Sequence, residues 1–335
     1  MNVFSLLKSE PTAPTLEERA LGAYLGFAVG DALGAPVEFM TPNEIKGTYN
    51  GIHNSMTGGG WLRLKPGQVT DDTQMSLALG GAMLANDGWN LRAVADAFVA
   101  WLRGRPIDVG NTCRRGIRRY LQTGTLCGTP AEEDGGNGAL MRNLPVALGT
   151  PPPLGDGTDA VFAQRSIEQA RITHGHVFSD EATVALGRMT RVLLAGGGRG
   201  DCRKIADALV ARHRTFAFDP WPGRTSGYVV DTVQTVLDVF FRGESFEACL
   251  LDVVNRGGDA DTNGALTGQL AGALWGVRAI PARWLRKLDK QVSAAVEAQV
   301  HGLLRLGHWT DGTDGTDAGQ GIKTGEHAHG NASEQ

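Results

Sequence analysis

Two short clusters of acidic and hydroxyl side chains each lie at the start of a strongly apolar segment. They occur in VTDDTQ at 69–74 and in GGDADTNGAL at 257–266. Carboxylate and hydroxyl oxygens suit Mg²⁺ or Mn²⁺, and without a nearby His or Cys they favour these ions over Zn²⁺. Four carboxylates brought together would repel one another unless a cation were bound. One interpretation is therefore a divalent-metal site shared by both clusters.

Helix capping would explain the same residue types. Asp and Thr side chains accept hydrogen bonds from the first N–H groups of a helix, and acids suit the positive end of the helix dipole. One acid is enough for a cap, whereas each cluster has two. Gly257 and Gly258 would also let the backbone approach a ligand or a neighbouring loop closely. Residue types alone leave both interpretations open.

The segments that must position these clusters have the periodicity of helices. Leu91, Val94, Phe98 and Leu102, for example, recur at three- and four-residue spacing, which predicts an amphipathic helix. Similar patterns predict helices at about 16–34, 72–86, 110–122, 161–174, 180–195, 201–213, 228–241, 262–276 and 282–305. Strand-turn-strand and βαβ patterns are not evident. The sequence therefore predicts an all-α, compact multi-helix fold.

Four glycines recur at every fourth position in the last cluster's helix. Gly264, Gly268, Gly272 and Gly276 would share one face. Each glycine costs about 1 kcal/mol relative to Ala inside a helix. We therefore expect this face to pack closely against another helix.

Composition predicts one domain with two tails. The chain has 335 residues, of which 41% are hydrophobic, and can bury a substantial core. We expect a flexible tail at 1–15, one domain at 16–309 and a disordered, acidic, Gly/Thr-rich tail at 310–335. The net charge of −4 matches the five acids and one Lys of this second tail. The remaining body is neutral, which argues against a nucleic-acid partner.

The cysteines and the apolar runs indicate a cytoplasmic protein. Cys113, Cys127, Cys202 and Cys249 form no C-x-x-C pair, which disfavours a zinc knuckle or a disulfide framework. We find neither a signal-peptide pattern nor a run of about 18 apolar residues that would predict an intrinsic membrane span.

Six segments carry a resemblance to a known family. The segments are GAYLGFAVGDALGAPVEF at 22–39, VTDDTQ at 69–74, DVGNTCRRG at 108–116, GNGALMRNLP at 136–145, THGHVFSDEA at 173–182 and NRGGDADTNGALTGQLAGALWG at 255–276. With these motifs in the family's order over about 20–280, the chain resembles the ADP-ribosylglycohydrolase family.

The resemblance implies an all-helical fold with a dinuclear Mn²⁺ or Mg²⁺ centre. It also implies a hydrolase that cleaves the N-glycosidic bond between ADP-ribose and an arginine side chain. Carried over by position, the metal ligands are Thr70, Asp71, Asp72, Asp259, Asp261 and Thr262.

Two further acids are expected to act in catalysis. Glu38 matches the family's acid near the metal centre or the reacting sugar. Asp108 is expected to meet the guanidinium, because a carboxylate can pair with the arginine fork through two hydrogen bonds. Asp108 could instead, or in addition, cap the helix that begins near Asn111.

The expected substrate contacts come from three segments. The GNGAL turn offers backbone N–H groups at 136–139 that suit diphosphate oxygens. Gly175 in HGH replaces a side chain that many relatives carry between the two histidines. The expected substrate-binding residues are Asn111, Asn137, Gly138, Ala139, Met141 and His174.

The runs GGGWL at 58–62 and GNTCRRGIRRY at 110–120 resemble family members that act on nitrogenase iron protein. That protein in its ADP-ribosylated form is the implied partner, with a PII-type nitrogen-signalling protein as a regulator and peripheral membrane association through a partner. The alternatives are hydrolysis of a serine-linked or polymeric ADP-ribosyl bond, and non-catalytic ADP-ribose binding. An HD-type phosphohydrolase is disfavoured, because no His is followed by Asp.

Overall fold

The computed structural model describes residues 13–153 and 158–310, and within these ranges it contains helices and no β-strand. The expected all-α class is confirmed. The α-helices are α2 (Leu16–Gly34), α3 (Pro42–Thr48), α4 (Asp71–Ala85), α5 (Leu91–Arg103), α6 (Asn111–Thr123), α7 (Leu144–Leu148), α8 (Thr158–Arg171), α9 (Val177–Leu194), α10 (Arg199–Arg212), α11 (Val229–Arg242), α12 (Phe246–Asn255), α13 (Ala260–Trp275), α14 (Ala282–Lys287) and α15 (Lys290–Leu306).

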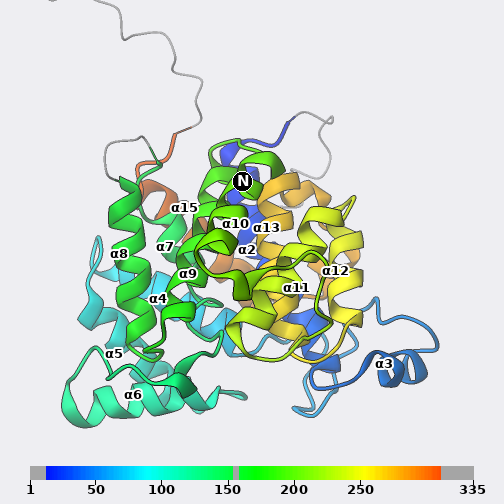
Figure 1. The fold of residues 1–335 in the computed structure, drawn as a ribbon, viewed down its shortest axis with the longest axis horizontal. Coiled ribbons are helices and arrows are strands. Elements are labelled where there is room, and N and C mark those ends of the chain that lie inside the picture. Colours follow the sequence, from blue (N-terminus) through cyan, green and yellow to red (C-terminus); the bar gives the residue numbers. More distant parts are fainter. Residues whose placement is uncertain (1–12, 154–157, 311–335) are drawn as a thin grey trace, which may run out of the picture.

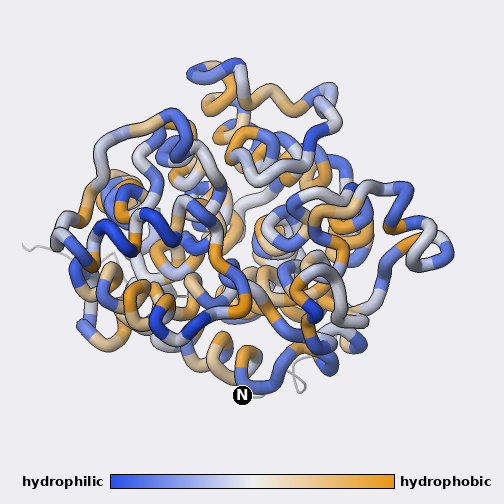
Figure 2. Tube along the Cα trace, turned by 90° about the horizontal axis from the view of Figure 1, so that it is seen from below, coloured by the Kyte–Doolittle hydropathy of each residue, from blue (hydrophilic) through white to orange (hydrophobic). Residues whose placement is uncertain are grey.

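Helices α2 and α13 form the centre of the molecule. Every residue of α2 from Ala20 onward is buried, and so are the residues of α13 as far as Ala273. The two helices lie side by side near the middle of Figure 1, with α8, α5 and α6 on one side and α11, α12 and α3 on the other. Peripheral helices alternate between apolar and hydrophilic stretches in Figure 2, as expected when one face packs on the core.

Glycines allow α2 and α13 to approach backbone to backbone. A Cβ added at Gly30 would overlap the carbonyl of Gly264, and one at Gly26 would overlap that of Gly268. The same relation joins Gly22 to Gly272, so the pairs run in opposite directions along the two helices. The close packing predicted for this glycine face is confirmed. Gly276 differs, because it lies just after α13 with a φ of 76°.

The segment Leu16–Val37 is long and apolar enough to cross a membrane by length and composition alone. Its most apolar 18-residue window is 100% buried inside the protein. The structure therefore explains the apolarity of α2 by its place at the centre of the core, where both faces meet other helices.

The predicted helix at 282–305 is two helices in the structure. Helix α14 ends at Lys287 and α15 begins at Lys290, because the Asp289 side chain accepts hydrogen bonds from the N–H groups of Gln291 and Val292. The short helices α3, α7 and α12 were not predicted. The predicted tails fall outside the described residues except for 13–15 and Thr310, and Thr15 caps α2.

Candidate active site

Three helix ends converge at the acidic clusters. Because α2 and α13 are antiparallel, the C-terminal end of α2 lies beside the N-terminal end of α13, and α4 begins against both. The Thr70 Oγ1 lies 3.5 Å from Asp261 Oδ2, and Thr262 Oγ1 donates to Asp72 Oδ2 at 3.3 Å. The fold thus brings the two clusters, about 190 residues apart, within hydrogen-bonding distance.

Capping does not account for the clusters. Thr70 and Asp259 occupy the N-cap positions of α4 and α13, yet neither side chain accepts a capping hydrogen bond. The N–H of Thr73 in the first turn of α4 donates instead to Asp31 Oδ2 at 3.1 Å. The Asp71 and Asp72 carboxylates accept hydrogen bonds from Gly110 and Thr262, which lie outside α4, and the second oxygen of Asp72 has no partner.

Asp31, on α2, is a buried residue that sequence reasoning missed. Its two oxygens accept hydrogen bonds from the backbone N–H and the hydroxyl of both Thr70 and Thr73, at 2.6–3.2 Å. These contacts fix the start of α4 against α2. An acid within the apolar run GFAVGDALG was the feature of the sequence that could have revealed this role.

The site carboxyl groups are buried, and burial raises their pKa values. The pKa rises to about 7 at Asp71 and to about 6 at Asp259. The Asp72 and Asp261 carboxyls have pKa values well above their usual range, because burial is reinforced by neighbouring carboxylates. Burial likewise raises the pKa of Glu38 to about 8, although the Trp61 indole N–H, at 2.7 Å, opposes this shift.

No lysine, arginine or histidine in 13–153 or 158–310 forms an ion pair with these carboxyl groups. The buried Asp72 Oδ1 has no hydrogen-bond partner. Oxygens of Glu38, Asp108 and Asp261 lie within 4.8 Å of one another. This all-oxygen donor set, with an unpaired buried acceptor beside it, fits a hard divalent cation.

A cavity of about 440 Å³ opens above the clusters and includes most of the predicted residues. Thr70 lies beneath Asp72 and does not line it. Ala139 does not line it either, because it is fully buried and its carbonyl accepts a hydrogen bond from Gln169. The predicted residues in the wall are Glu38, Asp71, Asp72, Asp108, Asn111, Asn137, Gly138, Met141, His174, Asp259, Asp261 and Thr262.

Asn137 is held by the acidic cluster. Its side-chain amide donates to the Asp259 carboxylate and to Thr232 Oγ1, and its backbone N–H donates to the Gly227 carbonyl at 3.1 Å. The N–H of Asn137 is therefore not free for a diphosphate, contrary to the expectation for the GNGAL turn. Burial and the nearby Arg142 lower the pKa of His174 well below its usual range, so this imidazole is neutral.

Asp108 does not cap α6. Its Oδ1 accepts a hydrogen bond from the adjacent Val109 N–H at 2.7 Å, whereas the N-cap of α6 is Gly110. The Gly110 N–H donates to Asp71 Oδ2 at 3.1 Å, so the start of α6 is tied to the acidic cluster. Burial raises the pKa of Asp108, and the charge of Arg114 opposes this shift.

Known proteins match the chain over the part that contains this site. The family model described as ADP-ribosylglycohydrolase matches residues 12–312. The chain belongs to this family. A relative from Rhodospirillum rubrum, ADP-ribosyl-[dinitrogen reductase] glycohydrolase, is 54% identical over 88% of this chain and 98% of its own length.

Two less similar proteins also match most of this chain. ADP-ribosylarginine hydrolase Tri1 of Serratia proteamaculans is 32% identical and covers 82% of this chain and 76% of its own. A solved structure titled ADP-ribosylglycohydrolase-related protein complex superposes with a TM-score of 0.75 at 35% identity, covering 88% of this chain and 99% of that one. The helical fold around the site is therefore that of the ADP-ribosylglycohydrolases.

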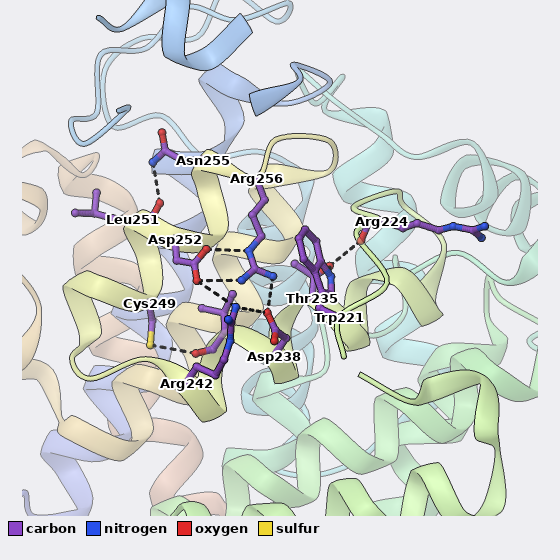
Figure 3. Close-up of polar contacts among 11 residues, drawn as sticks. Trp221, Arg224, Thr235, Asp238, Arg242, Cys249, Leu251, Asp252, Asn255 and Arg256 are labelled. Atoms are coloured by element: carbon purple, nitrogen blue, oxygen red, sulfur yellow. Dashed lines mark hydrogen bonds and ion pairs between the residues drawn. The ribbon is translucent and has the colours of Figure 1, made fainter. Parts of the chain in front are cut away.

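In this ADP-ribosylglycohydrolase the loop at 219–228 supports Asp259, whose N–H donates to the Thr225 carbonyl at 2.6 Å. The loop is fixed to α11 by Thr235, which accepts a hydrogen bond from the Trp221 indole and donates one to the Arg224 carbonyl (Figure 3). Asp259 is thereby connected to α11.

An ion-pair network lies behind the same loop. The Arg256 guanidinium packs 4.0 Å from the centroid of the Trp221 ring and makes ion pairs with Asp238 at 2.7 Å and Asp252 at 2.9 Å (Figure 3). Arg242 also pairs with Asp238. This network joins α11 and α12 behind Trp221.

Proposed function

We propose that the protein is a metal-dependent hydrolase that removes ADP-ribose from a modified arginine side chain of another protein. The convergence of two acidic clusters in one cavity, with Asp108 in its wall, carries this proposal. The names of the Rhodospirillum and Serratia relatives support it. The 54% identity to the former makes nitrogenase iron protein, also called dinitrogen reductase, the proposed target.

Two divalent cations, Mn²⁺ or Mg²⁺, are the proposed cofactors. Such ions lower the pKa of bound water toward neutrality and bind sugar hydroxyls. The buried carboxyl groups and the unpaired Asp72 Oδ1 support a cationic ligand at this place. The proposed ligands are Thr70, Asp71, Asp72, Asp259, Asp261 and Thr262, with Glu38 and Asp108 close enough to share an ion.

Cleavage of a bond between the anomeric carbon and a guanidine nitrogen develops positive charge on the sugar. A guanidinium leaving group can be held by the Asp108 carboxylate through two parallel hydrogen bonds. Burial raises the pKa of Glu38 above its usual range, which suits this carboxyl to proton transfer at the reacting atoms. We assign these two side chains the catalytic roles.

The remaining wall of the cavity would hold the ADP-ribose group. Asn111, Gly138, Met141 and His174 face it, and the neutral His174 imidazole can donate or accept a hydrogen bond. Asn137 would act by orienting Asp259. We propose a cytoplasmic location, where the four unpaired cysteines would stay reduced. A PII-type regulator stays a prediction.

The direct experiment is incubation of the protein with ADP-ribosylated nitrogenase iron protein, with and without Mn²⁺, followed by measurement of free ADP-ribose. We expect release with Mn²⁺, and none from the Asp71→Ala or Asp259→Ala variant. Full activity of either variant would refute the ligand assignment. Serine-linked and polymeric substrates assayed in parallel would reveal another linkage, and tight ADP-ribose binding without turnover would indicate a binding protein.

A further inference from the structure

Exposed hydrophobic side chains gather at the mouth of the cavity. Phe39 is 67% exposed and Trp61 is 53% exposed, and both line the cavity. Exposed Ile107 and Tyr228 are the chain neighbours of two further wall residues, Asp108 and Gly227. Single exposed hydrophobic residues are ordinary on protein surfaces, whereas several around one opening mark a contact surface.

The backbone of Phe39 is held in a conformation that aromatic residues seldom adopt. Its φ is 64°, in the left-handed region, where a bulky side chain is strained. The Phe39 N–H donates to the Gly258 carbonyl at 2.7 Å, and the Gly258 N–H donates to the Met40 carbonyl at 2.9 Å. Gly258 directly precedes Asp259. The loop that carries an acid of the site therefore also holds the backbone of Phe39 at the mouth of the cavity.

Phe39 and Trp61 form one apolar surface. Their ring centroids are 5.4 Å apart with an interplanar angle of 47°. The Trp61 indole donates to Glu38 at 2.7 Å, which ties this surface to the proposed catalytic carboxyl. A second hollow of about 570 Å³ shares the two rings and Glu38 with the cavity and is also bounded by Pro36, Met40, Glu44 and Thr48.

We propose that Phe39 and Trp61 dock the polypeptide that flanks the modified arginine. This proposal rests on the proposed function, in which the arginine remains part of a protein chain while its ADP-ribose group occupies the cavity. That chain must then pass over the mouth, where the two rings border both the cavity and the second hollow. An extended segment would cover both rings with its apolar side-chain surface and place the residue beside the arginine over the hollow.

The test compares two substrates in Mn²⁺, free ADP-ribosyl-arginine and ADP-ribosylated nitrogenase iron protein. In Phe39→Asn the ring is lost while Asn tolerates the left-handed backbone. We expect KM for the protein substrate to rise about tenfold, as for an aromatic residue central to an interface. The KM for free ADP-ribosyl-arginine should rise several-fold less than the KM for the protein substrate. Phe39→Tyr should restore the KM for the protein.

Val161→Asn provides the matched control. Val161 is also an exposed apolar residue, 41% exposed, but it lies on α8, at the opposite side of the molecule from α3, which follows Phe39 in the chain (Figure 1). This variant should leave both KM values unchanged. If Phe39→Asn folds poorly, Phe39→Gly can replace it, because Gly removes the ring and the backbone strain together. We expect the same rise in the KM for the protein substrate.

The outcomes separate the two proposals. Suppose that the wild type cleaves both substrates. If Phe39→Asn then changes both KM values equally, or leaves the KM for the protein substrate unchanged, the docking surface is overturned and the proposed function stands. Failure of the wild type to cleave either substrate would overturn the proposed function and the docking proposal with it.

Discussion

Asp31 shows how much of the site depends on a residue that does not face the cavity. Its side chain is fully buried in α2 and binds the backbone and hydroxyl groups of Thr70 and Thr73. Asp71 and Asp72 follow Thr70 directly. The position of the first acidic cluster is therefore set by a carboxylate from the central helix.

Replacing Asp31 by Asn should loosen the start of α4. The amide has one accepting oxygen, and its NH₂ group would face groups that donate to the carboxylate. We expect the free energy of unfolding in urea to fall by about 1–3 kcal/mol, and Mn²⁺ affinity measured by calorimetry to fall as well. Asp207→Asn is the control, because it removes only an exposed pair with Arg203 and should change neither quantity measurably.

The raised pKa values predict how pH affects the metal-free protein. In the folded chain the pKa is about 7 at Asp71 and about 8 at Glu38, against 3.8 and 4.5 as ordinary values. At a pH between the ordinary and the raised pKa of each group, the folded state binds more protons than the unfolded state. The stability present at low pH is therefore lost as pH rises. We expect the unfolding temperature in EDTA to fall from pH 5 to pH 8. The fall should be smaller in Asp71→Asn, and a rise over this range in both proteins would contradict the prediction.

The residues of the site were predictable to different degrees. Acids with neighbouring hydroxyls at the starts of apolar helices indicated the clusters at 70–72 and 259–262, which the fold does bring together. Trp61 and Asp31 were missed as partners of site residues, because each acts through a hydrogen bond to a residue distant in sequence. Such contacts depend on the packing of α2, which periodicity alone does not fix.

At the scale of elements, the contact of α2 with α13 positions the acids and tolerates no Cβ. A Cβ at Gly30 would overlap the backbone of Gly264, and helix backbones cannot shift as a side-chain end can. We expect Gly30→Ala to lower the free energy of unfolding by about 3 kcal/mol or more. Gly200→Ala on α10, where nothing lies within 4 Å, should be neutral or stabilise by up to about 1 kcal/mol. Equal changes of the free energy of unfolding in urea for the two variants would show that helix propensity, and not the packing of α2 on α13, determines the effect of Gly30→Ala.

The ion-pair network behind Trp221, which joins α11 to α12, leads to a second prediction at the scale of elements. Arg256→Met would remove the buried guanidinium partner of Asp238, which is only 7% exposed, and leave the exposed Arg242 as its ion-pair partner. We expect a loss of about 1–3 kcal/mol in the free energy of unfolding, because a hydrogen bond to a charged group contributes roughly this much and Arg242 still offsets part of the charge. The loop at 219–228 should become more sensitive to protease. Lys204→Ala, which removes an exposed partner of Asp201, should change stability by less than about 1 kcal/mol.

Long periodic elements were predicted and short or interrupted ones were not. The glycine repeat at 264–272 indicated close packing because its spacing matches a helix face. The break between α14 and α15 was missed, because the Asp289 side chain caps the start of a new helix while the apolar spacing continues across it. Helices α3 and α7, of 7 and 5 residues, are too short to show a period.

For the whole molecule, the proposed cations would join α4 to α13 and stabilise the fold. Binding to the folded state alone contributes about 2.7 kcal/mol when the free cation is at 100 times its Kd. We expect Mn²⁺ to raise the unfolding temperature of the metal-free protein, measured by calorimetry. Asp72→Asn should remove most of this increase. An equal increase in this variant would place the stabilising ion elsewhere.

The antiparallel pairing of α2 with α13 also has a consequence for protein synthesis. Helix α2 emerges from the ribosome early. The glycine face of α13 on which it packs emerges more than 200 residues later, together with the acids at 259–262. Until then its apolar surface lacks its native partner and is exposed to chaperones or to other nascent chains. The core is therefore completed in the same late step of synthesis that brings the two acidic clusters together. A fragment that ends before α13 should have neither a complete core nor the cavity.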